Sequence, residues 1–167
     1  MSILADITQA YKGPRREMRH QLSIVTEPRI LMLAFLFCLL SFVARMPELA
    51  KISHLAGDDP ATMRARFGGM FVATVFMAPL MLYGIAALSH LVMKALGGQG
   101  TWQGARLALM WAALVTCPLM LLSGIFKVYT PSPVFFVATC VTAVVFLWQW
   151  FSCLAEAEFA HTPQEAA

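Results

Sequence analysis

Two long stretches without a charged side chain, separated by a glycine-rich break, constrain this chain most. Residues 67–93 and 107–126 contain no Asp, Glu, Lys or Arg, and the sequence Gly97-Gly98-Gln99-Gly100 lies between them. As a helix rising about 1.5 Å per residue, each stretch is long enough to cross a hydrocarbon layer roughly 30 Å thick. A backbone in lipid must satisfy its own hydrogen bonds, so both stretches are predicted to be transmembrane helices.

The composition extends this prediction to the whole chain. Hydrophobic residues make up 59% of the sequence and charged residues only 13%, against roughly a quarter in soluble domains. We therefore predict an all-α, polytopic membrane helix bundle with about four transmembrane helices and an N-terminal amphipathic interfacial helix. The predicted segments are an amphipathic segment (1–28), a four-span domain (29–155, with spans at 29–46, 62–96, 102–126 and 133–155) and an acidic tail (156–167).

The first 28 residues suggest two short helices at the membrane surface. Residues 2–12 place apolar side chains on one stripe, with Asp6 assigned to another face, and Gly13-Pro14 then begins a second helix. Two locations stay open for these helices, the headgroup plane of the bilayer and the chain's own bundle. The basic residues predicted to contact lipid headgroups are Lys12, Arg15, Arg16 and Arg19.

Prolines and capping residues set the predicted helix ends and bends. Pro47 is predicted to end the first span, and a short interfacial helix closed by Gly57 follows it. Asp59 is predicted to cap the second long helix, whose bend is expected at Pro79. The remaining predictions are a cap at Thr101, a bend at Pro118, and a turn from Thr130 to Pro133 with Ser132 as cap.

The distribution of Lys and Arg indicates the orientation. With four spans, seven of these residues fall on the side of both termini and five on the other side. Positive residues are enriched on the cytoplasmic side of membranes, so both termini are predicted to be cytoplasmic. The net charge of +3 comes from clusters at the ends of the apolar runs, and no basic stripe or recognisable module predicts a nucleic-acid partner.

Small residues at four-residue spacing predict close helix contacts. The contact is expected between the second and third spans, with another protein as the alternative. The residues concerned are Gly69, Ala73, Gly104, Ala108 and Ala112.

Only a few polar side chains in the apolar segments are candidate ligands for a bound group. His90 is interpreted as an interfacial histidine bonded to a loop carbonyl. Cys38, Cys117 and Cys140 fall at a similar predicted depth, which suits a soft metal, but cysteine is also a common buried apolar residue. We predict no metal site, no cofactor and no disulfide framework.

The region around the glycine-rich break resembles a known family. Tyr83-Gly84-Ile85-Ala86-Ala87-Leu88-Ser89-His90, then Ala95 to Trp102 and Gly104 to Ala108, is similar to the bacterial branch of the Yip1 family, as are Pro14-Arg15 and Met18-Arg19-His20. The resemblance implies a multi-pass protein of a bacterial inner membrane. Members often carry five spans, whereas four are predicted here, and the vesicle-traffic partners of eukaryotic members do not transfer. The family brings no catalytic residues.

The predicted spans contain no acidic residue, which argues against an ion-coupled transporter. No nucleophile–base pair or phosphate loop is recognisable, so we predict no enzymatic activity.

The hypothesis is a scaffold or accessory subunit of a larger membrane assembly that contacts lipids and either another integral membrane protein or itself. The alternative is a small permease or channel component, in which bends at Pro79 and Pro118 line a path for a neutral solute.

Overall fold

The computed structural model describes residues 3–129 and 132–159, and every regular element in these ranges is helical. Four helical segments are long and apolar enough to cross a membrane, which confirms the predicted all-α fold with four candidate spans. The elements are α1 (Ile3–Lys12), α2 (Pro14–Ser23), α3 (Glu27–Ala56), α4 (Pro60–Val72), the π-helical η1 (Ala73–Met77), α5 (Ala78–Ala95), α6 (Trp102–Tyr129) and α7 (Ser132–Phe159).

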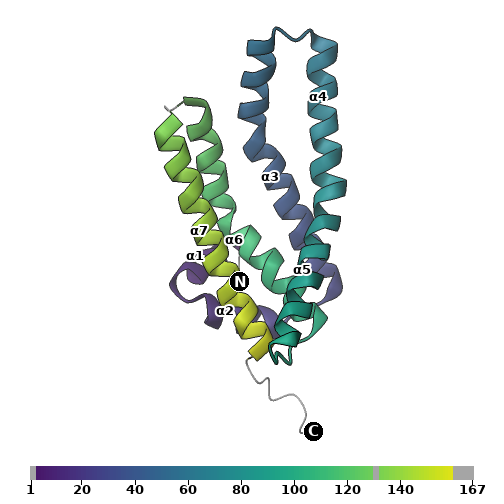
Figure 1. Cartoon of the computed structure of the whole chain (residues 1–167), viewed down its shortest axis with the longest axis vertical. Helices are drawn as coiled ribbons and strands as arrows, with labels where there is room; N and C mark the ends of the chain where they lie inside the picture. The colour runs from purple at the N-terminus through teal and green to yellow at the C-terminus, as the bar shows by residue number, and fades with distance from the viewer. Residues whose placement is uncertain (1–2, 130–131, 160–167) are drawn as a thin grey trace.

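Helix α6 is the central element of the bundle, and α3 and α7 pack most extensively against it. Figure 1 shows two helical hairpins, α3–α4 and α6–α7, which diverge towards one end of the molecule. At the other end, α1 and α2 lie beside α6 and α7, and the turn between α5 and α6 meets the end of α7. We call this second end the packed end.

The core sits in the first half of α6. Residues 107–117 are all buried, and Trp111 is fully covered. A membrane helix surrounded by lipid has no reason to hide its apolar side chains, so this burial identifies α6 as covered by protein on all sides there. By contrast, α4 has no buried residue.

The prediction that Pro47 ends the first span is wrong, because α3 continues through Pro47 to Ala56. Proline removes only one donor from the helix ladder, and packing in a bundle offsets that loss. Two contacts with α6 flank the proline. Glu48 forms an ion pair with Lys127, and a Cβ added to Gly124 would lie 2.3 Å from the carbonyl oxygen of Ala44. Gly57, with φ of 66°, ends the helix as predicted.

The second long helix follows its prediction and adds one feature. Asp59 caps it by accepting hydrogen bonds from the backbone N–H groups of Thr62 and Ala61 at 3.2 and 3.3 Å. The hydrogen bond from the Thr62 side chain, followed by that from its backbone N–H, holds the pKa of Asp59 below its usual value. Ahead of Pro79 the helix widens into η1, and the N–H of Ala78 bonds to the carbonyl of Ala73, one residue further back than in an α-helix. A π-turn thus accommodates the proline.

The N-terminal segment forms the two predicted helices, and both pack on the protein's own bundle. Ala10 and Met18 are fully buried in the core cluster with residues of α6 and α7. Asp6 is also buried, at 5% exposure, which corrects its assignment away from the apolar stripe. Residues four apart share a helix face, so Asp6 lies on the face of Ala10.

At the C-terminal side, α7 runs to Phe159, beyond the predicted end of the fourth span at residue 155. The first residues of the predicted acidic tail are therefore helical, and Glu156 and Glu158 are buried. Apolar periodicity could not show this, because the residues that cover the two glutamates come from distant parts of the chain. Of the predicted turn at 130–133, residues 130 and 131 lie outside the described ranges.

Candidate functional site

A buried histidine–glutamate pair joins two spanning helices at the packed end. His90 Nδ1 of α5 lies 2.6 Å from Glu158 Oε1 of α7, and the two side chains are 3% and 0% exposed. The ring of Trp102 covers the histidine, with ring centroids 4.3 Å apart. His90 was expected to bond a loop carbonyl, and its partner is instead a carboxylate 68 positions away in the sequence.

The glycine-rich break closes over this pair. The backbone N–H of Gln99 donates to the carbonyl of Glu158 at 2.9 Å. A Cβ added to Gly100 would lie 2.4 Å from the carbonyl oxygen of Ala157, and one added to Gly98 would lie 3.1 Å from Glu158 Oε2. The predicted helix stop is present at Gly97, where φ is 91°. Gly100 is required by the close approach of α7, whereas a Cβ at Gly98 would meet both the carbonyl oxygen of Met93, at 3.0 Å, and Glu158 of α7.

A second polar network connects α2 to α3. Gln21 Nε2 donates to Glu17 Oε1 at 2.8 Å, and an Arg29 guanidinium nitrogen donates to Gln21 Oε1 at 2.7 Å. Glu17 and Gln21 are buried. Buried polar groups need such partners, because an unpaired one loses its hydration without compensation.

An ion pair between Arg19 and Glu156 joins α2 to α7. The bond to this carboxylate raises the pKa of Arg19 above its usual value. Arg19 was predicted to contact lipid headgroups, and the structure gives it a partner within the chain. Lys12, Arg15 and Arg16 are exposed.

Helix α1 is fastened to both α6 and α7. The hydroxyl of Tyr11 donates to the carbonyl of Val115 at 2.7 Å, and Gln149 Nε2 donates to the carbonyl of Ala10 at 3.4 Å. Pro118 has no N–H to offer the carbonyl of Leu114, so the Tyr11 bond forms beside the gap that this proline leaves in α6. Burial, followed by the neighbouring Cys117, raises the pKa of Tyr11.

The predicted small-residue contacts divide into two groups. Gly104, Ala108 and Ala112 are buried in α6, and a Cβ on Gly104 would lie 3.5 Å from Ala157 Cβ and 3.6 Å from Leu22 Cδ2. Gly104 thus packs against α7 and α2, which corrects the expected contact with the second span. Gly69 and Ala73 are exposed, and no atom lies within 4 Å of a Cβ added to Gly69.

The three cysteines considered for a soft metal do not share one environment. Cys38 and Cys117 are buried, whereas Cys140 is exposed on α7. Within the described residues, no group of three or more His, Cys, Asp or Glu side chains is placed to hold a metal ion.

A comparison with protein families gives a match over nearly the whole chain. The model of the Yip1 domain matches residues 11–162. The chain belongs to the Yip1 domain family. The match includes α2, the four candidate spans and both glutamates at the end of α7, which confirms the resemblance drawn from the glycine-rich break. No curated protein and no solved structure gives a significant match to this Yip1 domain.

Sequence reasoning missed most of the polar side chains at the packed end of this Yip1 domain. Glu17, Gln21 and Gln149 carried no motif, and Glu156 and Glu158 were assigned to a tail. One signal was present. Glu156 and Glu158 follow an apolar run without an intervening Gly or Pro, and a helix continues where nothing breaks it.

Proposed function

We propose that this Yip1 domain protein is a non-catalytic scaffold or accessory subunit of a larger assembly in a bacterial inner membrane, with both termini in the cytoplasm. It contacts membrane lipids and a second integral membrane protein or another copy of itself. The observation that carries the proposal is an uncovered face on the second spanning segment. Only 11% of the most apolar window of Pro60–Ala95 is buried, against 50% for Trp102–Lys127. The window of Pro133–Phe159 is also uncovered, at 6% buried, but α7 contains no glycine.

Glycines on this face distinguish protein contact from ordinary exposure to lipid. Gly68, Gly69 and Gly84 lie within helices, where glycine is less favourable than alanine by about 1 kcal/mol. No atom lies within 4 Å of a Cβ added to any of them. Their small size therefore serves no contact within the chain, and it suits the close approach of a helix from another protein.

Two glycines of α6 show the opposite situation. A Cβ at Gly124 would meet the backbone of Ala44, and one at Gly104 would meet α7 and α2. At Gly124 the missing side chain is explained by packing inside the chain, whereas a Cβ at Gly104 would make ordinary van der Waals contacts at 3.4–3.6 Å. Gly69 and Ala73 lie four residues apart on the uncovered face. By the same reasoning, we propose that their small size allows a helix of a partner protein to pack there.

The charged groups support a structural role. At the packed end, His90, Glu158, Glu156 and Gln21 bond one another or other parts of the chain, an arrangement suited to joining helices. The exposed Lys12, Arg15 and Arg16 are suited to the phosphate groups of lipid headgroups. On this basis we propose that the assembly forms through helix faces and lipids rather than through chemistry on a substrate.

The first experiment is extraction of the full-length protein from native membranes in a mild detergent, followed by size separation and identification of co-migrating proteins. The proposal predicts stoichiometric co-migration with an integral membrane protein, or a defined homo-oligomer. Gly69→Leu fills the uncovered face and is expected to abolish this association.

Ala143→Leu is the matched control, since Ala143 is also an exposed small residue but lies on α7. The association is expected to survive in this variant. A protein that migrates as a monomer without a partner, or an association that Gly69→Leu leaves intact, contradicts the proposal.

One observation favours the alternative of a permease or channel component. The π-helical segment Ala73–Met77 next to Pro79 is a local irregularity of a kind often found at functional sites. Pro79→Ala separates the two functions. In a scaffold it changes only stability, whereas in a gate it changes solute flux through reconstituted vesicles.

A further inference from the structure

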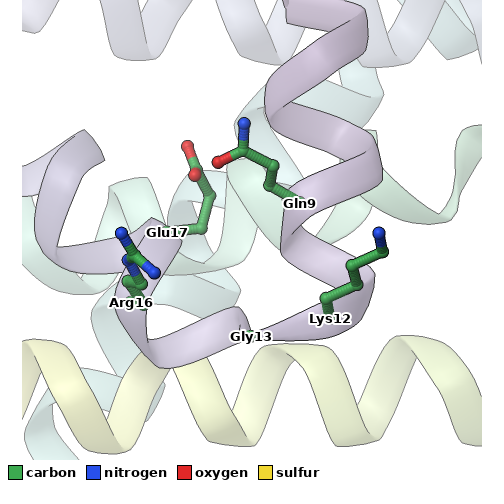
Figure 2. Close-up of a pocket in the computed structure, with 5 residues that line it drawn as sticks. All are labelled: Gln9, Lys12, Gly13, Arg16 and Glu17. Carbon is green, nitrogen blue, oxygen red and sulfur yellow. The ribbon is translucent and has the colours of Figure 1, made fainter.

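A cavity of about 340 Å³ lies between α1 and α2 at the packed end. Its lining residues are Gln9, Lys12, Gly13, Arg16 and Glu17. In Figure 2 the side chains of Gln9 and Glu17 extend towards each other across the space between the two helices, and Lys12 and Arg16 lie on either side of it, nearer the turn at Gly13. Gln9, Lys12 and Arg16 are exposed, so the cavity opens to the surface.

The lining of this cavity carries charges of both signs. Glu17 is only 6% exposed, and Gln21 Nε2 holds its Oε1 at 2.8 Å. His20 Nδ1 lies 3.7 Å from the same oxygen. The carboxylate is therefore fixed in the wall of the cavity, while the two cationic side chains near the turn are free to move in solvent.

We propose that this cavity binds the zwitterionic phosphoethanolamine headgroup of a membrane phospholipid. Lys12 and Arg16 bind the phosphate, and Glu17 with the amide oxygen of Gln9 accepts hydrogen bonds from the ammonium group. The inference deepens the proposed lipid contact of the basic residues, and it is independent of the proposed partner on α4.

The order of charges selects this headgroup over simpler ones. A phosphate without an amine is attracted by Lys12 and Arg16 but gains nothing from Glu17, and an amine without a phosphate is repelled by the two cations. A primary ammonium carries three N–H donors, whereas the trimethylated amine of choline has none.

The test measures lipid retention by native mass spectrometry of the full-length protein in detergent. Phosphatidylethanolamine, phosphatidylglycerol and phosphatidylcholine with the same acyl chains are added at equal concentration. We expect phosphatidylethanolamine to be retained about threefold or more above the other two, the size typical of one partly exposed charged contact. Glu17→Gln should reduce it to the level of phosphatidylglycerol, and the double variant Lys12→Gln, Arg16→Gln should lower the retention of both lipids.

Two further variants keep the test decisive. Glu17 also supports Gln21, so Gln9→Leu, at an exposed position, repeats the test without disturbing that bond and should reduce the preference for phosphatidylethanolamine. Arg15→Gln removes a charge near the turn outside the cavity lining and should preserve the preference.

Equal or greater retention of phosphatidylglycerol, or equal retention of phosphatidylcholine, by the wild-type protein overturns the proposal. Co-migration with a protein partner should be unchanged in Gln9→Leu, so the two proposals fail separately.

Discussion

His90 of α5 and Glu158 of α7 meet at 2.6 Å in a fully protein-covered environment. The contact joins the C-terminal half of α5 to the last turn of α7. Removing one partner from a buried hydrogen-bonded pair leaves the other polar group without compensation, which costs about 1–3 kcal/mol. This relationship leads to the first of four predictions.

Glu158→Ala is expected to destabilise the protein by about 1–3 kcal/mol, because the His90 side chain loses its partner in a buried site. Thermal unfolding of the purified protein in detergent measures the effect. The double variant with His90→Ala should be much less destabilised than the sum of the single variants. A coupling free energy near zero in this cycle would show that the pair contributes nothing to stability.

Gly124→Ala is expected to destabilise by about 1–3 kcal/mol, the usual range for overpacking. The added Cβ would lie 2.3 Å from the carbonyl oxygen of Ala44, so α3 and α6 must separate. In the purified chain without a partner, Gly84→Ala is the matched control, since Gly84 is also a helical glycine but has no atom within 4 Å of the added Cβ. It should leave stability unchanged or raise it. Equal melting temperatures for the two variants would contradict the close crossing of α3 and α6.

Tyr11→Phe is expected to cost about 1 kcal/mol, since it deletes the hydrogen bond to the carbonyl of Val115 and keeps the ring. The loss should appear as faster amide exchange in α1, which this bond fastens to α6. Tyr83→Phe removes a hydroxyl from α5 and serves as the comparison, for which exchange in α1 should not change. Unaltered protection of α1 in Tyr11→Phe would mean that apolar packing alone holds this helix.

The cap at the start of α4 should depend on pH in a defined direction. The pKa of Asp59 is lowered in the folded state by its bonds to Thr62 and Ala61, so its stabilising effect is complete above the unfolded pKa, about 3.9. The effect is lost as pH falls through the lower, folded value. The protection of the amides of residues 61–63, corrected for the pH dependence of intrinsic exchange, should therefore fall only below about pH 4.

Asp59→Asn provides the control for this titration, because asparagine also caps helices but does not ionise. Its exchange should lack the acid-dependent step. The same step in both proteins would assign it to another group.

The sequence alone determined the membrane class of this protein, its four apolar helices and most of their ends. These properties depend on local chemistry. A stretch without charge must be helical in lipid, Asp59 and Thr101 offer oxygens to free N–H groups, and Gly57 and Gly97 adopt positive φ. Each can be read from a few neighbouring residues.

Only the tertiary structure decided which helix is central and which polar groups are buried. From the sequence, Glu158 was assigned to a tail, but α5 and the turn at Gly100 cover it in the structure. Pro47 was predicted to end a helix, but contacts between α3 and α6 on both sides of the proline stabilise a continuous helix. Gly69 and Gly124 look alike in sequence, yet one faces outward and the other touches a backbone. Such distinctions arise from contacts between residues far apart in the chain, which no local pattern encodes.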